Sequence, residues 1–272
     1  MSECIVITSG KGGVGKTTAT ANIGLALAMS GQRVAVMDAD IGLRNLDVIL
    51  GLENRIVYDL VHVVEGECRL KQALIKDKRV EGLHLLPAAQ TRDKNAVTPD
   101  QMRRLVAQLK ETFDYVLVDC PAGIEQGFRN SVAGADRAII VTTPEVSAIR
   151  DADRIIGLVE AAELPEPNLI INRYRSGMVK TGDMLSREDI LEILAIPLIG
   201  IVPESEEIII NSNRGQPAAL DPESKVGESF RRIARRLQGE KDVPFVALET
   251  APGFWTSVKR WMGLGTAREV AS

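Results

Sequence analysis

Cysteine and histidine, which build most inorganic sites, are scarce in this chain. Its 272 residues include three cysteines and two histidines, which excludes a three-histidine metal site. Cys4, Cys68 and Cys120 are too far apart for the paired spacing of a zinc ribbon. Such a small, odd number of cysteines fits a reducing compartment.

Long apolar runs and an excess of basic residues are also missing. No apolar stretch approaches the ~18 residues that a membrane-spanning helix needs. Met1 leads directly into an apolar segment, with no basic region and no cleavage site, so we expect no secretion signal. The net charge of −4 disfavours a dedicated nucleic-acid binder. These absences predict a cytosolic protein.

What the chain does contain is a regular alternation of β-branched runs and helical patterns. Seven runs rich in Val, Ile and Leu predict buried strands at Cys4–Ser9, Arg33–Asp38, Leu83–Pro87, Tyr115–Asp119, Ala138–Thr143, Leu169–Asn172 and Leu198–Pro203. Helices are expected at Thr17–Ser30, Pro99–Lys110, Ser147–Ala162 and Ser186–Leu194, and from Asp221-Pro222 to Leu237. This order predicts an α/β fold, a doubly wound and mostly parallel sheet with helices on both faces.

The composition changes once, where charged and helix-breaking residues gather near the C-terminus. We therefore expect a single P-loop NTPase domain over residues 1–238 and a linker over 239–252. A short amphipathic helix over 253–264 and a disordered tail over 265–272 are expected to follow.

A phosphate-binding loop follows the first predicted strand. The sequence satisfies the pattern G-x-x-x-x-G-K-[ST] with Gly10, Lys11, Gly12, Gly13, Val14, Gly15, Lys16, Thr17 and Thr18. The glycines let backbone N–H groups converge on phosphate oxygens at the start of a helix, where the helix dipole favours anions. Lys16 would neutralise the β- and γ-phosphates, and the Thr17 hydroxyl would ligate Mg²⁺ directly.

Acidic residues end two of the predicted strands, at the sheet edge where such folds bind ligands. Asp38 ends the second predicted strand and Asp40 lies just beyond it, and Asp119 ends the run Tyr115–Asp119 in the Walker B pattern. Asp38 and Asp119 are expected to support Mg²⁺ through water. A strand-ending aspartate can also simply form a turn.

Two further residues are candidates for contacting adenine. Asn172 lies at the end of the predicted strand Leu169–Asn172, where its amide could read the base edge. Pro203 ends the next predicted strand, and the backbone carbonyls around it are a second candidate. Asn172 could instead only start a turn.

The loop and the segment after the second strand resemble the ParA/MinD family of deviant Walker A P-loop ATPases. Lys11 gives the KGGxGK[ST] variant of that family, and Gly42-Leu-Arg-Asn-Leu-Asp47 resembles the switch I region of its MinD branch. The resemblance runs from Ile5 to about Leu237. It implies slow, Mg²⁺-dependent, partner-stimulated ATP hydrolysis by an ATP-sandwich homodimer. In that dimer Lys11 reaches the opposing subunit's phosphates, Lys16 acts beside it, and Asp40 is catalytic.

The same resemblance implies a role in positioning the division septum. Its expected partners are the division inhibitor MinC and either MinE or another topology factor. Five residues match the partner-binding surface of the family: Arg44, Asn45, Arg150, Asp151 and Asp153. The alternative for the last three is a solvated, charged helix face.

Both tryptophans lie in the C-terminal segment, which has the pattern of a membrane-surface helix. Within about 120° of arc at helical spacing lie Phe254, Trp255, Val258, Trp261 and Met262. Lys259 and Arg260 flank that arc, and the segment is too short to span a bilayer. The segment predicts reversible attachment to anionic lipid on the inner face of the cell membrane. Docking of this helix on the core would use the same periodicity.

Some alternatives stay open at this stage. The arginines Arg231, Arg232, Arg235 and Arg236 form a stripe that is either a solvated face or an aid to anionic-surface attraction. A DNA-partition ATPase of the ParA type is the main alternative function, and an ATP-dependent DNA retardation assay would distinguish it. An electron carrier like the nitrogenase iron protein would need cysteines that ligate an iron–sulfur cluster. A small-molecule kinase would need a binding site for the phosphate acceptor. A nucleotide-binding scaffold without hydrolysis would need Asp40 to have no catalytic role.

Overall fold

The computed structural model describes residues 2–93 and 95–246, so the predicted helix 253–264 and tail 265–272 lie outside the described residues. One eight-stranded sheet has the order β3-β4-β2-β5-β1-β6-β7-β8. Its strands are β1 (Glu3–Thr8), β2 (Val34–Asp38), β3 (Ile75–Lys76), β4 (Leu83–Leu86), β5 (Tyr115–Asp119), β6 (Arg137–Thr142), β7 (Asn168–Tyr174) and β8 (Leu198–Pro203). All pairings are parallel except that of β3 with β4.

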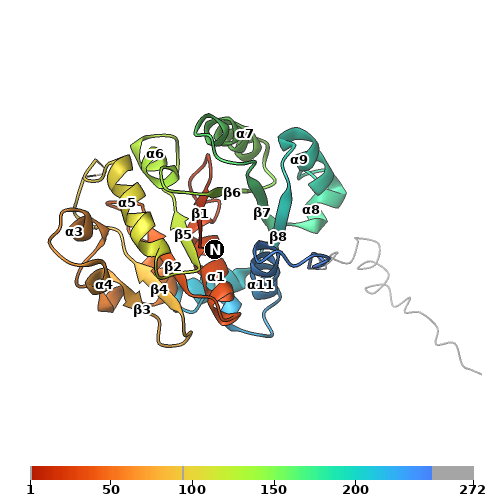
Figure 1. Ribbon diagram of the computed structural model, residues 1–272. Helices are drawn as coiled ribbons and strands as arrows, with labels where there is room; N and C mark the ends of the chain where they lie inside the picture. Colours follow the sequence, from red (N-terminus) through yellow and green to blue (C-terminus); the bar gives the residue numbers. More distant parts are fainter. Residues whose placement is uncertain (1, 94, 247–272) are drawn as a thin grey trace, which may run out of the picture.

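The helices fall into two layers. They are α1 (Lys16–Met29), α2 (Leu46–Leu50), α3 (Leu60–Val64), α4 (Leu70–Ala73), α5 (Pro99–Lys110), α6 (Gln126–Val132), α7 (Val146–Ala161), α8 (Ser176–Thr181), α9 (Arg187–Leu194), α10 (Glu206–Asn213) and α11 (Lys225–Leu237). Two single-turn 3₁₀ helices add Glu53–Arg55 and Ala218–Leu220. Figure 1 shows α5, α6 and α7 over one face of the sheet and α1 and α11 over the other. The doubly wound fold expected from the sequence is confirmed.

The continuous apolar strands are buried on both faces, because each strand contributes side chains to the two hydrophobic cores on either side of the sheet. In β1, Cys4 and Val6 pack toward the α5–α7 side, while Ile5 and Ile7 pack toward α1 and α11. This arrangement explains why the strands show no polar alternation in the sequence.

Helix α1 is buried on nearly every side, because it lies between the sheet, α2 and α11. Gly24 allows this close approach, since a Cβ atom there would lie 2.4 Å from Cγ1 of Val36. The helix that follows the phosphate loop is therefore held firmly against the sheet.

Helix starts follow local capping where the sequence offers it. Thr98 and Ser186 cap α5 and α9 through capping boxes with Gln101 and Asp189. Helix α11 ends at Leu237 as expected, but its predicted start at Asp221-Pro222 was wrong. Asp221 instead forms a turn by accepting the Glu223 N–H, and Ser224 caps the helix through the Gly227 N–H at 2.9 Å.

The predicted strand Leu169–Asn172 started one residue too late and ended two residues too early. Strand β7 continues to Tyr174 through an irregularity, in which Arg173 adopts φ 53°. The short helices α2, α3, α4, α6, α8 and α10 were not predicted, because segments of one or two turns carry little periodicity.

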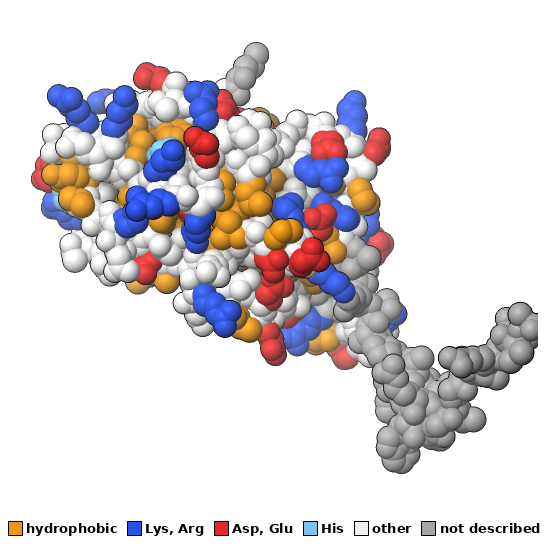
Figure 2. All heavy atoms as spheres, turned by 90° about the horizontal axis from the view of Figure 1, so that it is seen from below, with side chains coloured by type: hydrophobic (Ala, Val, Ile, Leu, Met, Phe, Trp, Pro, Cys, Tyr) orange, Lys and Arg blue, Asp and Glu red, His pale blue; other side chains and the backbone are white. Residues whose placement is uncertain are grey.

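Within residues 2–93 and 95–246, no helix has the length and apolar character needed to cross a membrane. Figure 2 shows basic and acidic side chains interspersed on the face seen from below, with hydrophobic side chains between them. That face therefore presents no single-sign surface.

Candidate nucleotide-binding site

The phosphate loop lies at the carboxyl end of β1, in the middle of the sheet, and leads directly into α1. Gly13 and Gly15 have φ angles of 76° and 98°, a left-handed region that side chains other than glycine's rarely adopt. Lys16 is the first residue of α1 and is only 8% exposed. The loop and helix start thus have the form that cradles phosphates.

Three neighbouring segments pack against this loop. A Cβ atom on Gly10 would lie 2.2 Å from the Asp151 carbonyl oxygen in α7, and one on Gly15 would lie 2.3 Å from Nδ2 of Asn172. On Gly12 it would lie 3.9 Å from Cβ of Ala122, in the segment after β5. Gly10 and Gly15 therefore also allow α7 and β7 to approach the loop closely, whereas the segment after β5 is in ordinary contact with it.

Asp38 and Asp119 lie side by side, because β2 and β5 are neighbours and these residues are paired in register. They are 1% and 2% exposed. Asp38 accepts the backbone N–H groups of Asp40, Asn45 and Leu46 at 2.9, 3.1 and 3.1 Å, which fixes the start of the switch I segment. The carboxylates thus form one buried acidic pair beside the phosphate loop.

Burial raises the pKa of both carboxyl groups in this pair. The negative charge of Asp38 raises the pKa of Asp119 further, while Thr17 and Lys16 lower it. The Thr20 hydroxyl lies 3.4 Å from Oδ1 of Asp119 and 3.0 Å from the Lys16 carbonyl oxygen. The raised pKa of the pair indicates that local groups do not fully balance its charge.

Such oxygen donors suit Mg²⁺, which commonly takes one or two carboxylates together with phosphate oxygens of its substrate. The described part of the chain contains no cluster of three or more His, Cys, Asp or Glu side chains placed to hold a metal by themselves. The residues present thus fit a cation that arrives with a nucleotide. Thr17, Asp38 and Asp119 are the residues that would support it.

Asp40 lies just beyond this pair, at the entrance to the switch I segment. It lines a small cavity together with Pro121, from the segment that follows β5. The Gly42 N–H donates to the Ala89 carbonyl oxygen at 2.8 Å, which ties the segment to the sheet edge. The structure therefore brings the start of the switch I segment next to the segment that follows β5.

Lys11 lies on the outer side of the loop, with its side chain 43% exposed. Its Nζ atom is 3.5 Å from Oε2 of Glu145 and 3.3 Å from Oγ of Ser147, at the start of α7. The lysine that distinguishes this loop is therefore paired within the same chain.

The two adenine candidates lie near one another at the ends of β7 and β8. The Asn172 amide donates to the Val14 carbonyl oxygen at 2.7 Å, so it supports the phosphate loop directly. Pro203 lines a cavity of about 820 Å³ together with Tyr174, Arg175 and Glu204. This volume suits a nucleotide-sized ligand. Contact of either residue with adenine stays a prediction.

The expected partner residues lie on two segments. Arg150 and Asp153 are exposed on α7, whereas Asp151 is half-buried where the helix meets Gly10. Asn45 is exposed before α2, but Arg44 is mostly buried and pairs with Asp47 at 2.7 Å. Arg44 thus has a structural role within the chain.

Three residues that contact the predicted site residues were not identified as part of the site from the sequence. Thr20 lies near Asp119, and its spacing of four residues from Lys16 could have indicated a shared helix face. Glu145 and Ser147 meet Lys11 from more than 130 residues away, and no local pattern signals that contact.

Comparison with known proteins gives consistent matches over most of the chain. The CobQ/CobB/MinD/ParA nucleotide binding domain matches residues 5–218. The chain is 56% identical over 267 residues to the septum site-determining protein MinD of Bacillus subtilis, covering 97% of this chain and 99% of that protein.

Solved structures give the same result. The MinC:MinD cell division protein complex of Aquifex aeolicus matches with a TM-score of 0.83 and 52% identity, over 88% of this chain and 97% of that one. The MinD protein of Pyrococcus horikoshii complexed with Mg-ADP matches with a TM-score of 0.80 and 30% identity, over 87% and 96%.

Proposed function

The chain belongs to the MinD branch of the CobQ/CobB/MinD/ParA family of nucleotide-binding proteins, and from that membership we propose a membrane-cycling mechanism for it. It is a septum site-determining ATPase that uses ATP and Mg²⁺. In the proposed cycle an ATP-bound homodimer attaches to the membrane and carries the division inhibitor MinC, and hydrolysis releases it. The cycle therefore places the protein both in the cytoplasm and on the inner face of the cell membrane.

One observation supports the chemistry above the others: a buried pair of carboxylates, with raised pKa, beside a phosphate loop that carries two lysines. Mg²⁺ bound with the nucleotide would supply the positive charge that this pair lacks. Lys16 and the loop N–H groups stabilise charge on the phosphate oxygens. Asp40, at the entrance to switch I, is in place to orient the attacking water.

Lys11 supports the dimer part of the proposal. Its side chain is half-exposed at the rim of the site and is held by an ion pair with Glu145 and a contact with Ser147. An exposed ion pair of this kind is worth at most ~1 kcal/mol. Lys11 can therefore leave Glu145 at little cost and reach the phosphates bound by a second subunit.

The predicted helix 253–264 supports the membrane part, although it lies outside the described residues. Burying its five apolar side chains would contribute about 10 kcal/mol at about 2 kcal/mol each. Two cations near anionic lipid would add about 2 kcal/mol. Ordering some ten residues costs about as much, at ~1 kcal/mol or more each. One tail is therefore marginal, whereas two tails on one dimer can gain about 10²–10⁴ in avidity.

The partner part of the proposal rests on α7. A MinD protein 52% identical to this chain forms a complex with MinC, so we extend MinC binding to this chain. Arg150, Asp151 and Asp153 lie on α7, and the Asp151 backbone packs against Gly10 of the phosphate loop. A partner on α7 could thus respond to the nucleotide. MinE or another topology factor is proposed to stimulate hydrolysis through the same dimer.

Sedimentation with anionic liposomes, in ATP and in ADP, tests this proposal. We expect the wild-type protein to pellet in ATP and to stay largely in the supernatant in ADP. Trp255→Glu and Trp261→Glu should abolish pelleting because a charge opposes burial of the apolar face, while nucleotide binding is retained. Trp255→Phe is the matched control and should still pellet. Equal pelleting of both Glu variants and the wild-type protein would contradict the membrane proposal.

A further inference from the structure

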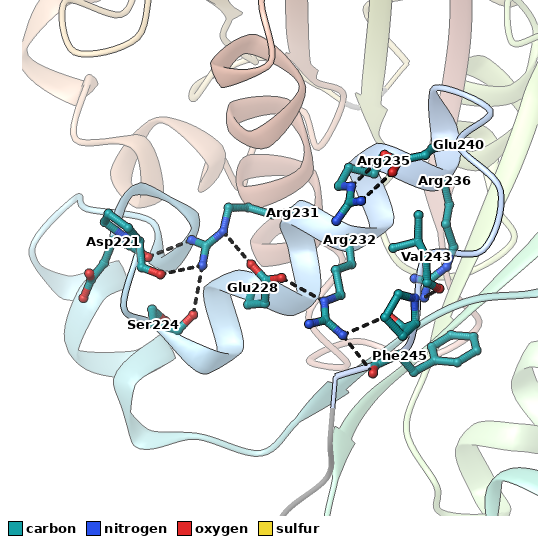
Figure 3. A network of polar contacts seen from close by, with 12 residues as sticks. Asp221, Ser224, Glu228, Arg231, Arg232, Arg235, Arg236, Glu240, Val243 and Phe245 are labelled. Atoms are coloured by element: carbon teal, nitrogen blue, oxygen red, sulfur yellow. Dashed lines mark hydrogen bonds and ion pairs between the residues drawn. The ribbon is translucent and has the colours of Figure 1, made fainter.

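The four arginines of α11 do not form a solvated stripe. Figure 3 shows each of them directed at a specific partner. Arg231 donates to backbone carbonyl oxygens of Ala219, Asp221, Pro222 and Ser224. Glu228 accepts from both Arg231 and Arg232, at 3.0 and 2.8 Å. Arg235 pairs with Glu240, just beyond the helix.

Two of these arginines hold the chain that leaves the core. Arg232 Nη1 donates to the carbonyl oxygens of Pro244 and Phe245 at 3.0 and 2.9 Å. Arg236 joins this segment to the sheet, because it donates to the carbonyl oxygens of Val243 and Ile199, both at 2.8 Å. Residues 243–245, expected to belong to a linker, are thus bonded to α11 and connected to β8 through Arg236.

The Phe245 ring completes the contact. Its centroid lies 4.2 Å from Cζ of Arg236 and 5.1 Å from Cζ of Arg187, at cation–π distance from both. The ring also packs against the hydrophobic core on the α5–α7 side of the sheet. Val243 is 9% exposed, so the segment buries two apolar side chains along with its backbone bonds.

We propose that Arg232, Arg236 and Phe245 form a clamp that fixes the point at which the chain leaves the core, and so sets how tightly the ATP-bound dimer holds the membrane. The proposal rests on the membrane attachment proposed above. The bonded Phe245 carbonyl shares a peptide plane with the nitrogen and Cα of Val246, so the held segment extends to Val246. Six residues, 247–252, then lie between the held segment and the predicted helix. Without it the connection would run from 239 to 252, fourteen residues.

Connection length matters because the second tail of a dimer binds at an effective concentration that falls roughly as the −3/2 power of length. Lengthening from six to fourteen residues therefore lowers it by about 3- to 4-fold. Binding through a single tail does not depend on this length. Loss of the clamp should thus weaken attachment in ATP and leave the weak binding in ADP unchanged.

The test compares liposome affinities of R232A/R236A with those of R235A, using the full chain and vesicles that contain an anionic lipid. R235A removes a positive charge from the same helix but leaves residues 243–246 held. We expect R232A/R236A to bind about 3- to 4-fold more weakly in ATP. R235A should bind like the wild-type protein. R236K keeps the charge but loses the forked geometry that joins two carbonyls. Its affinity for the vesicles should therefore fall between that of R232A/R236A and that of R235A.

An insertion of eight Gly and Ser residues after Val246 keeps the test valid even if the double variant fails to fold. It lengthens the connection with the clamp and all charges intact, and the same 3- to 4-fold loss is expected. Equal weakening by R235A and R232A/R236A would overturn the clamp and favour charge attraction to lipid. Wild-type affinity of the insertion would also overturn it. No ATP-dependent binding by the wild-type protein would overturn the membrane proposal itself, and the clamp's role with it.

Discussion

The phosphate-binding edge of the sheet and the α11 clamp are both rich in charged side chains, but they differ in how far neighbouring groups of the protein balance those charges. At the sheet edge two buried carboxylates lie side by side, and their pKa is raised. On α11 the guanidinium groups are matched by carbonyl oxygens, carboxylates and an aromatic ring. Charge left unbalanced by the protein marks the place where a charged ligand binds, and charge balanced by the protein marks structure.

The energetic consequences differ accordingly. A hydrogen bond to a charged group contributes about 1.5–3 kcal/mol to stability, so the clamp stabilises the chain where it leaves the core. A raised carboxyl pKa means that the ionised form costs stability in the folded state. The acidic pair therefore costs stability in the absence of the Mg²⁺ and nucleotide that we propose it supports. Substitutions in the acidic region at the carboxyl ends of the strands should therefore alter ATP hydrolysis. Substitutions in the clamp should alter how firmly residues 243–246 are held against the core.

The largest effect is expected from Asp40→Asn. Asparagine keeps the shape of the side chain but cannot take up a proton or attract the attacking water as a carboxylate does. We expect ATP hydrolysis to fall by about 10² or more, since positioned acid–base groups contribute about 10²–10⁴. ATP binding should change by less than about 3-fold, because Lys16 and the loop are the residues proposed to hold the phosphates. Phosphate release and equilibrium nucleotide binding measure the two quantities.

Asp183→Asn is the matched control for Asp40→Asn. Asp183 lies in the loop after α8 and bonds to Thr181, away from the acidic pair. Its replacement should leave hydrolysis unchanged. If Asp40→Asn keeps more than half of wild-type hydrolysis, Asp40 has no role in the chemistry. The contrast between a functional phosphate-binding region and a structural clamp would then lack support.

A smaller, pH-dependent effect is expected from Asp119→Asn. In the folded protein the pKa of Asp119 lies above its ordinary value near 4, so between those two values the folded state binds more protons than the unfolded state. Stability therefore falls as the pH rises above about 4. Asparagine resembles the protonated form, so the variant should be more stable at neutral pH without nucleotide, by ~1–3 kcal/mol or a few degrees in Tm.

Thermal melts at pH 4.5 and pH 7.5, without nucleotide or Mg²⁺, measure this difference. The gain in Tm should shrink at the lower pH, because wild-type Asp119 is then protonated as well. Addition of Mg-ADP should raise the Tm of the wild-type protein more than that of the variant. A variant less stable than the wild-type protein at pH 7.5 would show that the acidic pair is fully balanced by its surroundings.

Much of the fold follows from the sequence, because its signals are local. Strands buried on both faces read as unbroken apolar runs, and the glycine and lysine spacing of the phosphate loop has few other uses. Thr98 and Ser186 mark helix starts by chemistry contained in four residues. These features depend on neighbours along the chain, so a single sequence can predict them.

The rest depends on strand order and on long-range packing. Asp38 and Asp119 become a pair only because β2 and β5 are adjacent, which no local pattern reveals. The α11 arginines read as a stripe because the carbonyl oxygens they meet, such as that of Ile199, leave no trace in the sequence. Lys11 shows the same limit, since Glu145 reaches it only through the packing of α7 on the loop.

The smallest effect is expected from Phe245→Leu, which separates packing from charge in the clamp. Leucine keeps apolar contact with the core but removes the ring that faces Arg187 and Arg236, a loss of about 0.5–1 kcal/mol per exposed cation–π contact. A loss of about 1 kcal/mol should speed amide hydrogen exchange at Val243, Phe245 and Val246 by about 5-fold. ATP hydrolysis should stay at the wild-type level.

Phe113→Leu, in the core beside His84, is the control: it should lower Tm without changing amide exchange at 243–246. If Phe245→Leu instead lowered hydrolysis as Asp40→Asn does, the clamp and the phosphate edge would be one coupled system. Charge balance would then no longer distinguish structure from site.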